Sequence, residues 1–172
     1  MVFDNDLAFM YVSINKNKKA LPLYIKSMKG YENTLGDDHV ITASVYNNLG
    51  ELYRLIKQYD NAFPLIEKAI NIRELEGGAN PIDLAYSYNT MGVYYTDIKN
   101  YVKALDYLNK ALNILNSTLG ENHVNTKGAK TNIEFLYSLM NSESNNSIKK
   151  IKIGRNDSCH CGSGKKYKMC CV

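Results

Sequence analysis

The chain has 172 residues, 45% of them hydrophobic, and a formal net charge of +4. This length and composition can bury an ordinary core, so we expect one domain with an appendage. No apolar run approaches the ~20 residues that a membrane-spanning helix needs, which argues against a membrane protein. Asp4 and Asp6 precede most of the apolar residues of the N-terminal segment and the lysines follow them, which is the reverse of a secretory signal. The sequence therefore predicts a cytoplasmic protein.

The first part of the chain repeats with a period of 42 residues. The segment Leu35–Val40 (LGDDHV) returns as Leu119–Val124 (LGENHV). That return is two periods later, and further residues recur at every period: Ala20, Ala62 and Ala104; Gly36, Gly78 and Gly120; Tyr11, Tyr53, Tyr95 and Tyr137. Chance agreement at so many positions is implausible, so this part is built from repeated structural units.

Each unit is predicted to form two helices. Tyr46, Leu49 and Tyr53 follow one another at spacings of three and four, as one buried helical stripe requires. Gly50 and Gly92 occupy the same position of the first helix in successive units, where a small residue lets a neighbouring helix approach closely. The second helix of each unit is predicted to end at a glycine: Gly36, Gly78 and Gly120.

Repeated helix pairs with this small–Tyr–Ala pattern resemble tetratricopeptide repeats, and the 42-residue period resembles the longer repeats of kinesin light chains. The resemblance implies an all-α fold, a right-handed helix-turn-helix solenoid of about three units over residues 1–140. A single closing helix is expected from about Asn122 to Met140. About three stacked units are the minimum for a stable solenoid, because one unit cannot bury its apolar face alone.

In such repeats the first helix of each unit lines a concave groove that binds peptides. By resemblance, the groove of this chain would contain Asn5, Asn47, Glu51, Arg54, Tyr86, Asn89, Asp97 and Thr131. Asn5, Asn47 and Asn89 form a ladder, and each amide has a donor and an acceptor with which to hold a peptide backbone. Alternatively, these asparagines bond to each other or meet solvent. The groove lacks a repeated Lys/Arg set, which disfavours recognition of a terminal carboxylate.

No catalytic constellation is apparent. His39 and His123 lie at junctions between units, and Pro81 fills the equivalent position, so a capping or packing role is expected for both histidines. No Ser/His/Asp set, pair of acids or phosphate-binding glycine loop can be assembled, and the sequence predicts that the protein is not an enzyme.

A polar segment follows the repeats. Residues 141–147 (NSESNNS) show no apolar period, and we expect a flexible linker over residues 141–152. The charge also changes here, because the residues from Ile148 onward carry +6 and those before it carry −2. A mildly acidic body with a basic tail is therefore predicted.

All four cysteines lie near the C-terminus, at Cys159, Cys161, Cys170 and Cys171. A segment of some twenty residues cannot bury enough apolar surface to fold alone, whereas four thiolates around one Zn²⁺ would hold it together. Residues 154–171 (GRNDSCHCGSGKKYKMCC) resemble the SEC-C motif, the zinc-binding tail of the SecA translocation ATPase; Ser158 and His160 replace its usual prolines. We expect residues 153–172 to form this small zinc knuckle, with a single structural Zn²⁺.

Other interpretations of the cysteines remain open. Iron or copper(I) also binds sulfur ligands. A redox pair at Cys170 and Cys171, a disulfide framework, and His160 as a substitute ligand are weaker alternatives.

The function predicted from these parts is that of a protein–protein interaction adaptor or scaffold. A peptide or protein would bind in the groove, and the zinc knuckle would contact a second partner, by resemblance to SecA a chaperone or ribosomal surface. One alternative is nucleic-acid binding through the basic tail, with Tyr167 stacking on a base. Another is an assembly module whose groove is filled by a helix of another protein.

Overall fold

The computed structural model of the protein describes residues 2–75 and 80–150, and every secondary-structure element in these ranges is an α-helix. The helices are α1 (Val2–Ser13), α2 (Asn17–Leu35), α3 (Val40–Leu55), α4 (Tyr59–Leu75), α5 (Pro81–Asp97), α6 (Tyr101–Leu119) and α7 (Val124–Lys150). None of these described helices is long and apolar enough to cross a membrane.

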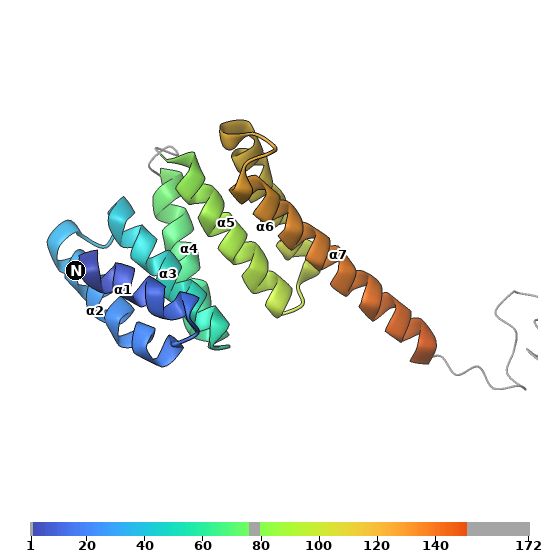
Figure 1. Ribbon diagram of the computed structural model, residues 1–172, viewed down its shortest axis with the longest axis horizontal. Coiled ribbons are helices and arrows are strands. Elements are labelled where there is room, and N and C mark those ends of the chain that lie inside the picture. The colour runs from blue at the N-terminus through green and yellow to red at the C-terminus, as the bar shows by residue number, and fades with distance from the viewer. Residues whose placement is uncertain (1, 76–79, 151–172) are drawn as a thin grey trace, which may run out of the picture. The chain divides into compact units, whose positions relative to one another are not determined.

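The chain divides into two compact units, Met1–Leu136 and Tyr137–Val172. In the first unit, three helical hairpins, α1–α2, α3–α4 and α5–α6, follow one another in space in chain order (Figure 1). The second helix of one hairpin packs on the first helix of the next, α2 on α3 and α4 on α5. The start of α7 closes the series, because Ala129 clusters with Leu115 of α6 and Ala85 of α5. The all-helical repeat fold is therefore confirmed.

The core of the first unit has the same period as the sequence. Ala20, Ala62 and Ala104 are fully buried on the second helices. Larger side chains of these helices are buried one turn further on, again 42 residues apart: Tyr24, Ile66 and Leu108. Since each hairpin supplies the same small and large residues at the same positions, one packing arrangement recurs along the unit.

Two glycines allow the helices of one hairpin to touch. A Cβ atom added at Gly50 would lie 2.6 Å from Cγ1 of Ile66, and one at Gly92 would lie 2.6 Å from Cγ of Leu108. These contacts confirm the close approach expected from the sequence. The first hairpin carries Ala8 at this position, and that residue is also fully buried.

Positive φ angles mark the chain reversals. Gly36 (φ 93°) and Gly120 (φ 83°) end α2 and α6 as predicted, whereas Gly78 lies outside the described residues. The turn within each hairpin places a non-glycine residue in the left-handed region: Asn15 (φ 57°), Lys57 (φ 62°) and Lys99 (φ 62°). The backbone of the repeat thus recurs even where the side chain at the position changes.

The last helix differs from expectation. We expected the closing helix to end near Met140 and a linker to follow, but α7 continues to Lys150. Between Gly128 and Gly154 the sequence has neither glycine nor proline, so no residue in the Asn/Ser-rich stretch forces the helix to stop. The division at residues 140 and 152 stays a prediction, and residues 151–172, with the predicted zinc knuckle, lie outside the described part of the chain.

Candidate functional site

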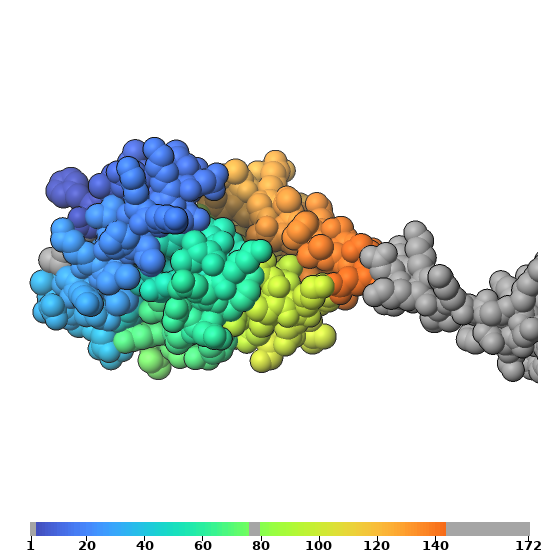
Figure 2. Space-filling view, turned by 90° about the horizontal axis from the view of Figure 1, so that it is seen from below, coloured from blue at the N-terminus to red at the C-terminus, as the bar shows by residue number. Residues whose placement is uncertain are grey.

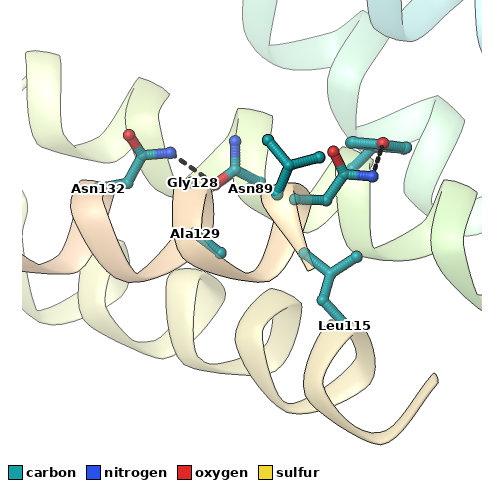
Figure 3. Close-up of a pocket in the computed structure, with 8 residues that line it drawn as sticks. Asn89, Leu115, Gly128, Ala129 and Asn132 are labelled. Carbon is teal, nitrogen blue, oxygen red and sulfur yellow. Dashed lines mark hydrogen bonds between the residues drawn. The ribbon is translucent and has the colours of Figure 1, made fainter. Parts of the chain in front are cut away.

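The predicted asparagine ladder lies on the first helices of the hairpins, and each member is hydrogen-bonded to the next first helix. The Oδ1 atom of Asn89 accepts a bond from Nδ2 of Asn132 at 2.8 Å (Figure 3), and that of Asn47 accepts one from Oγ of Ser87 at 3.1 Å. Oδ1 of Asn5 accepts a longer bond, 3.5 Å, from Nδ2 of Asn48. The ladder therefore links successive units through its carbonyl groups, and the amide of Asn5 also donates a long bond, 3.5 Å, to Asp6. Asn47 is 9% exposed, so little of it is accessible.

Glu51, Arg54 and Asp97 form one ion-pair cluster between α3 and α5. The guanidinium of Arg54 donates two bonds to Glu51, at 2.8 and 2.7 Å, and one to Asp97 at 2.5 Å. Burial alone would lower the pKa of Arg54, but the hydrogen bonds and charges of Glu51 and then Asp97 outweigh it and raise the pKa. With two carboxylates around one guanidinium, the cluster carries an excess negative charge and offers no free cation to an acidic ligand.

A pocket of about 260 Å³ opens between α5, α6 and α7 (Figure 3). Two predicted groove residues, Tyr86 and Asn89, line it from α5. The side-chain amide of Asn125 donates to Oη of Tyr86 at 2.6 Å. The remaining lining comes from α6 and α7: Leu115, Val124, Asn125, Gly128, Ala129 and Asn132.

Sequence reasoning missed part of this lining. Thr131 was expected in the groove, but it is not among the pocket residues, and its hydroxyl donates to the carbonyl of Lys127 in its own helix. The adjacent Asn132 faces Asn89 instead (Figure 3). A signal existed, because the Asn5–Asn48 and Asn89–Asn132 pairs share one spacing in the sequence.

The equivalent space one repeat earlier is filled. Forty-two residues before Leu115 stands Arg73, which is 7% exposed and extends its guanidinium into the junction between α3 and α5. It donates to Oγ of Ser44 and to the carbonyl of Asp83, both at 2.9 Å, and to Oγ of Ser87. These acceptors hold the charge although burial lowers the pKa of Arg73.

Substitutions at the last junction open the pocket. Leu115 replaces the arginine and Ala129 replaces Ser87, so the guanidinium and one of its hydroxyl acceptors are missing. Gly128 stands where the previous repeat has Tyr86, and a Cβ added there meets nothing within 4 Å. No counterpart of the Arg73 guanidinium therefore fills the space at the junction between the third hairpin and the closing helix.

The pocket combines an apolar floor with an amide rim. Leu115 and Ala129 are buried beneath it. The bonds described above use Oδ1 of Asn89 and the Nδ2 groups of Asn125 and Asn132. These bonds leave the NH2 group of Asn89, a second N–H on each of Asn125 and Asn132, and the carbonyl oxygens of Asn125 and Asn132, so the rim has both the donors and the acceptors that a peptide backbone needs. No charged side chain lines the pocket, so this part of the site favours a neutral ligand group.

The histidines at the junctions are helix caps. Nδ1 of His39 accepts from the backbone N–H of Ile41 at 3.1 Å, and Nδ1 of His123 accepts from that of Asn125 at 3.2 Å. Asn80 serves the same purpose before Pro81, where its Oδ1 accepts from the N–H of Ile82 at 3.2 Å. The capping role expected for His39 and His123 is confirmed.

The predicted metal ligands Cys159, Cys161, Cys170 and Cys171 lie outside the described residues. Within residues 2–75 and 80–150, no group of three or more His, Cys, Asp or Glu side chains could hold a metal ion. The cysteine set therefore stays the candidate metal site.

Family models match most of the chain. Tetratricopeptide-repeat models match residues 2–75 and 84–125, and the SEC-C motif matches residues 155–171. The repeat matches span α1–α4 and α5–α6, which are the three hairpins of the structure.

Solved structures share the repeat fold. The structure of BtubC (BKLC) from P. vanneervenii aligns with a TM-score of 0.61 and 29% identity over 69% of this chain and 48% of that one. A putative kinesin light chain from Podospora anserina, with nearly identical TPR-like repeats, aligns with a TM-score of 0.65 and 16% identity over 87% of this chain and 75% of that one.

Curated relatives match a short segment. A UPF0225 protein of Vibrio parahaemolyticus is 67% identical over 27 residues, which is 16% of each chain. SecA of Caldicellulosiruptor saccharolyticus is 71% identical over 24 residues, 14% of this chain and 3% of SecA. The chain thus spans a small fraction of these relatives. The hairpins and the family models show that the chain belongs to the tetratricopeptide-repeat proteins and carries a SEC-C motif.

Proposed function

We propose that the protein is an adaptor that holds an extended peptide on its first helices and contacts a second partner through a zinc-bound C-terminal knuckle. The tetratricopeptide fold is a scaffold for protein–protein interaction. The single observation that carries the peptide part is the pocket of about 260 Å³ between α5, α6 and α7.

The size and lining of the pocket define the ligand group. Sites for drug-sized molecules measure about 300–1,000 Å³, so this pocket suits one side chain of a longer ligand. Its apolar floor at Leu115 and Ala129 would take an aliphatic or aromatic side chain. The unused amide groups of Asn89 and Asn132 would bond to the peptide backbone on either side.

The ion-pair cluster at the C-terminal end of α5 adds a further preference. The Glu51–Arg54–Asp97 cluster carries excess negative charge on α3 and α5. A peptide that runs from the pocket along these helices would gain from a basic residue at the cluster. This electrostatic term would act mainly on specificity and on the rate of association.

A selection of peptides tests the groove. The full chain is screened against a displayed library of random peptides, and the binders are measured by titration calorimetry against wild type and Asn89→Ala. We expect enriched peptides that share one large apolar residue, and a roughly five- to tenfold loss of affinity in the variant, because a backbone bond is lost. Failure to enrich any peptide, or unchanged affinity in Asn89→Ala, counts against the groove.

The proposed zinc knuckle depends on the four cysteines of the C-terminal segment. Four thiolates in a segment matched by the SEC-C motif suit one structural Zn²⁺, which would order the knuckle and leave no open position for catalysis. By likeness to the short SecA match, a chaperone or ribosomal surface is the first partner to test.

Metal analysis tests this second part separately. We expect about one zinc per purified chain by mass spectrometry, and substantial loss in Cys170→Ser, since three thiolates hold zinc less tightly. The helical circular dichroism and melting temperature of the repeats should not change. Metal content well below one per wild-type chain would refute the zinc knuckle and leave the groove proposal intact.

A further inference from the structure

A stripe of large apolar side chains runs along the outer side of α1. Phe3, Leu7 and Met10, spaced by four and three residues, lie on one helical face, and Ile14 follows in the turn after the helix. Phe3 is 87% exposed and Met10 is 63% exposed. In Figure 2, the first two helices (blue) lie at one end of the described first unit.

The repeat shows what such a stripe does elsewhere. The residues 42 positions later are Val45, Leu49, Leu52 and Ile56. Leu49 and Leu52 are buried in a cluster with Ala20 and Tyr24 of the preceding hairpin. Another 42 residues on, Met91 is buried in the same way. In later hairpins this face is therefore an inter-unit contact, whereas on α1 it is exposed.

This face of α1 is exposed among the described residues, and contiguous exposed apolar side chains mark interaction surfaces. Phe3, Leu7 and Met10 have the spacing of the a and d positions of a helix that pairs with another helix.

We propose that α1 pairs antiparallel with α1 of a second copy of this chain, forming a two-fold symmetric dimer. A two-fold interface brings the same patch of both copies together, and a stripe with this spacing is complementary to itself. This arrangement needs no groove ligand and no metal, so it is independent of the proposed adaptor function.

Charge selects the antiparallel direction. The first half of α1 carries the exposed Asp6, whereas Asp4 is paired with Lys26 of α2. The exposed Lys16 directly precedes α2, and the exposed Lys18 lies in its first turn. An antiparallel pair brings Asp6 of each copy toward these lysines of the other, whereas a parallel pair would place like charges together. The helix dipoles also oppose one another favourably in the antiparallel arrangement.

Sedimentation equilibrium of the full chain tests the dimer. We expect wild type to have twice the mass of the chain, and Met10→Glu to weaken the dimer at least ~100-fold, because two carboxylates would be buried across the two-fold axis. Val102→Glu is the matched control: Val102 is 83% exposed on α6 and away from the stripe, so this variant should remain dimeric. Circular dichroism checks that both variants fold.

Neutralising one charge tests the direction. Asp6→Asn should weaken an antiparallel dimer, since it removes an attraction to the lysines of the other copy, but should tighten a parallel one by relieving Asp6–Asp6 repulsion. Wild type that remains monomeric at its highest soluble concentration overturns the proposal, as does Met10→Glu that dimerises like wild type. Tightening by Asp6→Asn overturns the antiparallel pairing.

Discussion

At the scale of single residues, the repeat imposes its backbone even on side chains that do not favour it. Lys57 and Lys99 have φ near 62° in the turn within their hairpins, where the first hairpin has Asn15. Asparagine tolerates this left-handed conformation better than lysine does, because its short polar side chain can bond locally. The lysine turns therefore hold some backbone strain that glycine would relieve.

Lys57→Gly should stabilise the protein. The left-handed conformation costs a side-chain-bearing residue roughly 1–2 kcal/mol, and the greater freedom of glycine in the unfolded chain returns about half of that. We expect a net gain of about 0.5–1 kcal/mol in the free energy of unfolding by urea. Lys68→Gly, inside α4, is the opposite case and should lose stability. A loss in Lys57→Gly would show that the lysine side chain contributes more than its backbone costs.

The contacts of single side chains could not be predicted from the sequence. The asparagine ladder was visible at an interval of 42 residues, but the sequence did not show that each Oδ1 atom bonds to the next helix. The pocket was also hidden. It depends on the absence of a guanidinium at Leu115, which is apparent only once Arg73 is seen to fill the corresponding space.

At the scale of elements, tyrosine–glutamate bonds connect successive hairpins. Oη of Tyr46 on α3 donates to Glu32 of α2 at 2.7 Å, and Oη of Tyr88 on α5 donates to Glu74 of α4 at 2.6 Å. Burial and then the bond to Glu32 raise the pKa of Tyr46 to about 12. The folded state therefore keeps a proton that the unfolded state loses near its ordinary pKa of 10.0.

Stability should accordingly fall in alkali. Because the pKa of Tyr46 is higher in the folded state, its contribution is complete below pH 10 and declines as the pH rises toward about 12. Tyr46→Phe should cost about 1 kcal/mol at neutral pH through the lost hydrogen bond, and its stability should decline less steeply above pH 10. Urea unfolding of both proteins across this range measures the difference. Parallel curves would contradict a role for the Tyr46 hydroxyl.

The elements themselves were largely predictable. Period, helix pairing and the stops at Gly36 and Gly120 follow from apolar spacing and from glycine, because every hairpin repeats the same local choices. The end of α7 was not predictable from polarity. Asparagine and serine only weakly disfavour helix, and without glycine or proline the segment after Met140 stays helical to Lys150.

At the scale of the whole molecule, one chain combines three surfaces with different chemistry. The groove residues of α5 and α7 offer neutral amides over an apolar pocket. The outer side of α1 offers an apolar seam. The SEC-C segment, residues 155–171, carries the four cysteines among basic residues. Because different residues make up the three regions, each can be tested by a variant at residues that the others do not use.

The most direct test of the central claim fills the pocket without disturbing the fold. Gly128→Leu adds a side chain where space is free and removes a helical glycine, so the free energy of unfolding should rise by roughly 0.5–1 kcal/mol. Calorimetric titration with a selected peptide should nevertheless show at least ~10-fold weaker binding. Ser117→Leu, which adds the same group at an exposed site on α6, should bind like wild type. Undiminished affinity in a folded Gly128→Leu protein would contradict the pocket as the peptide site.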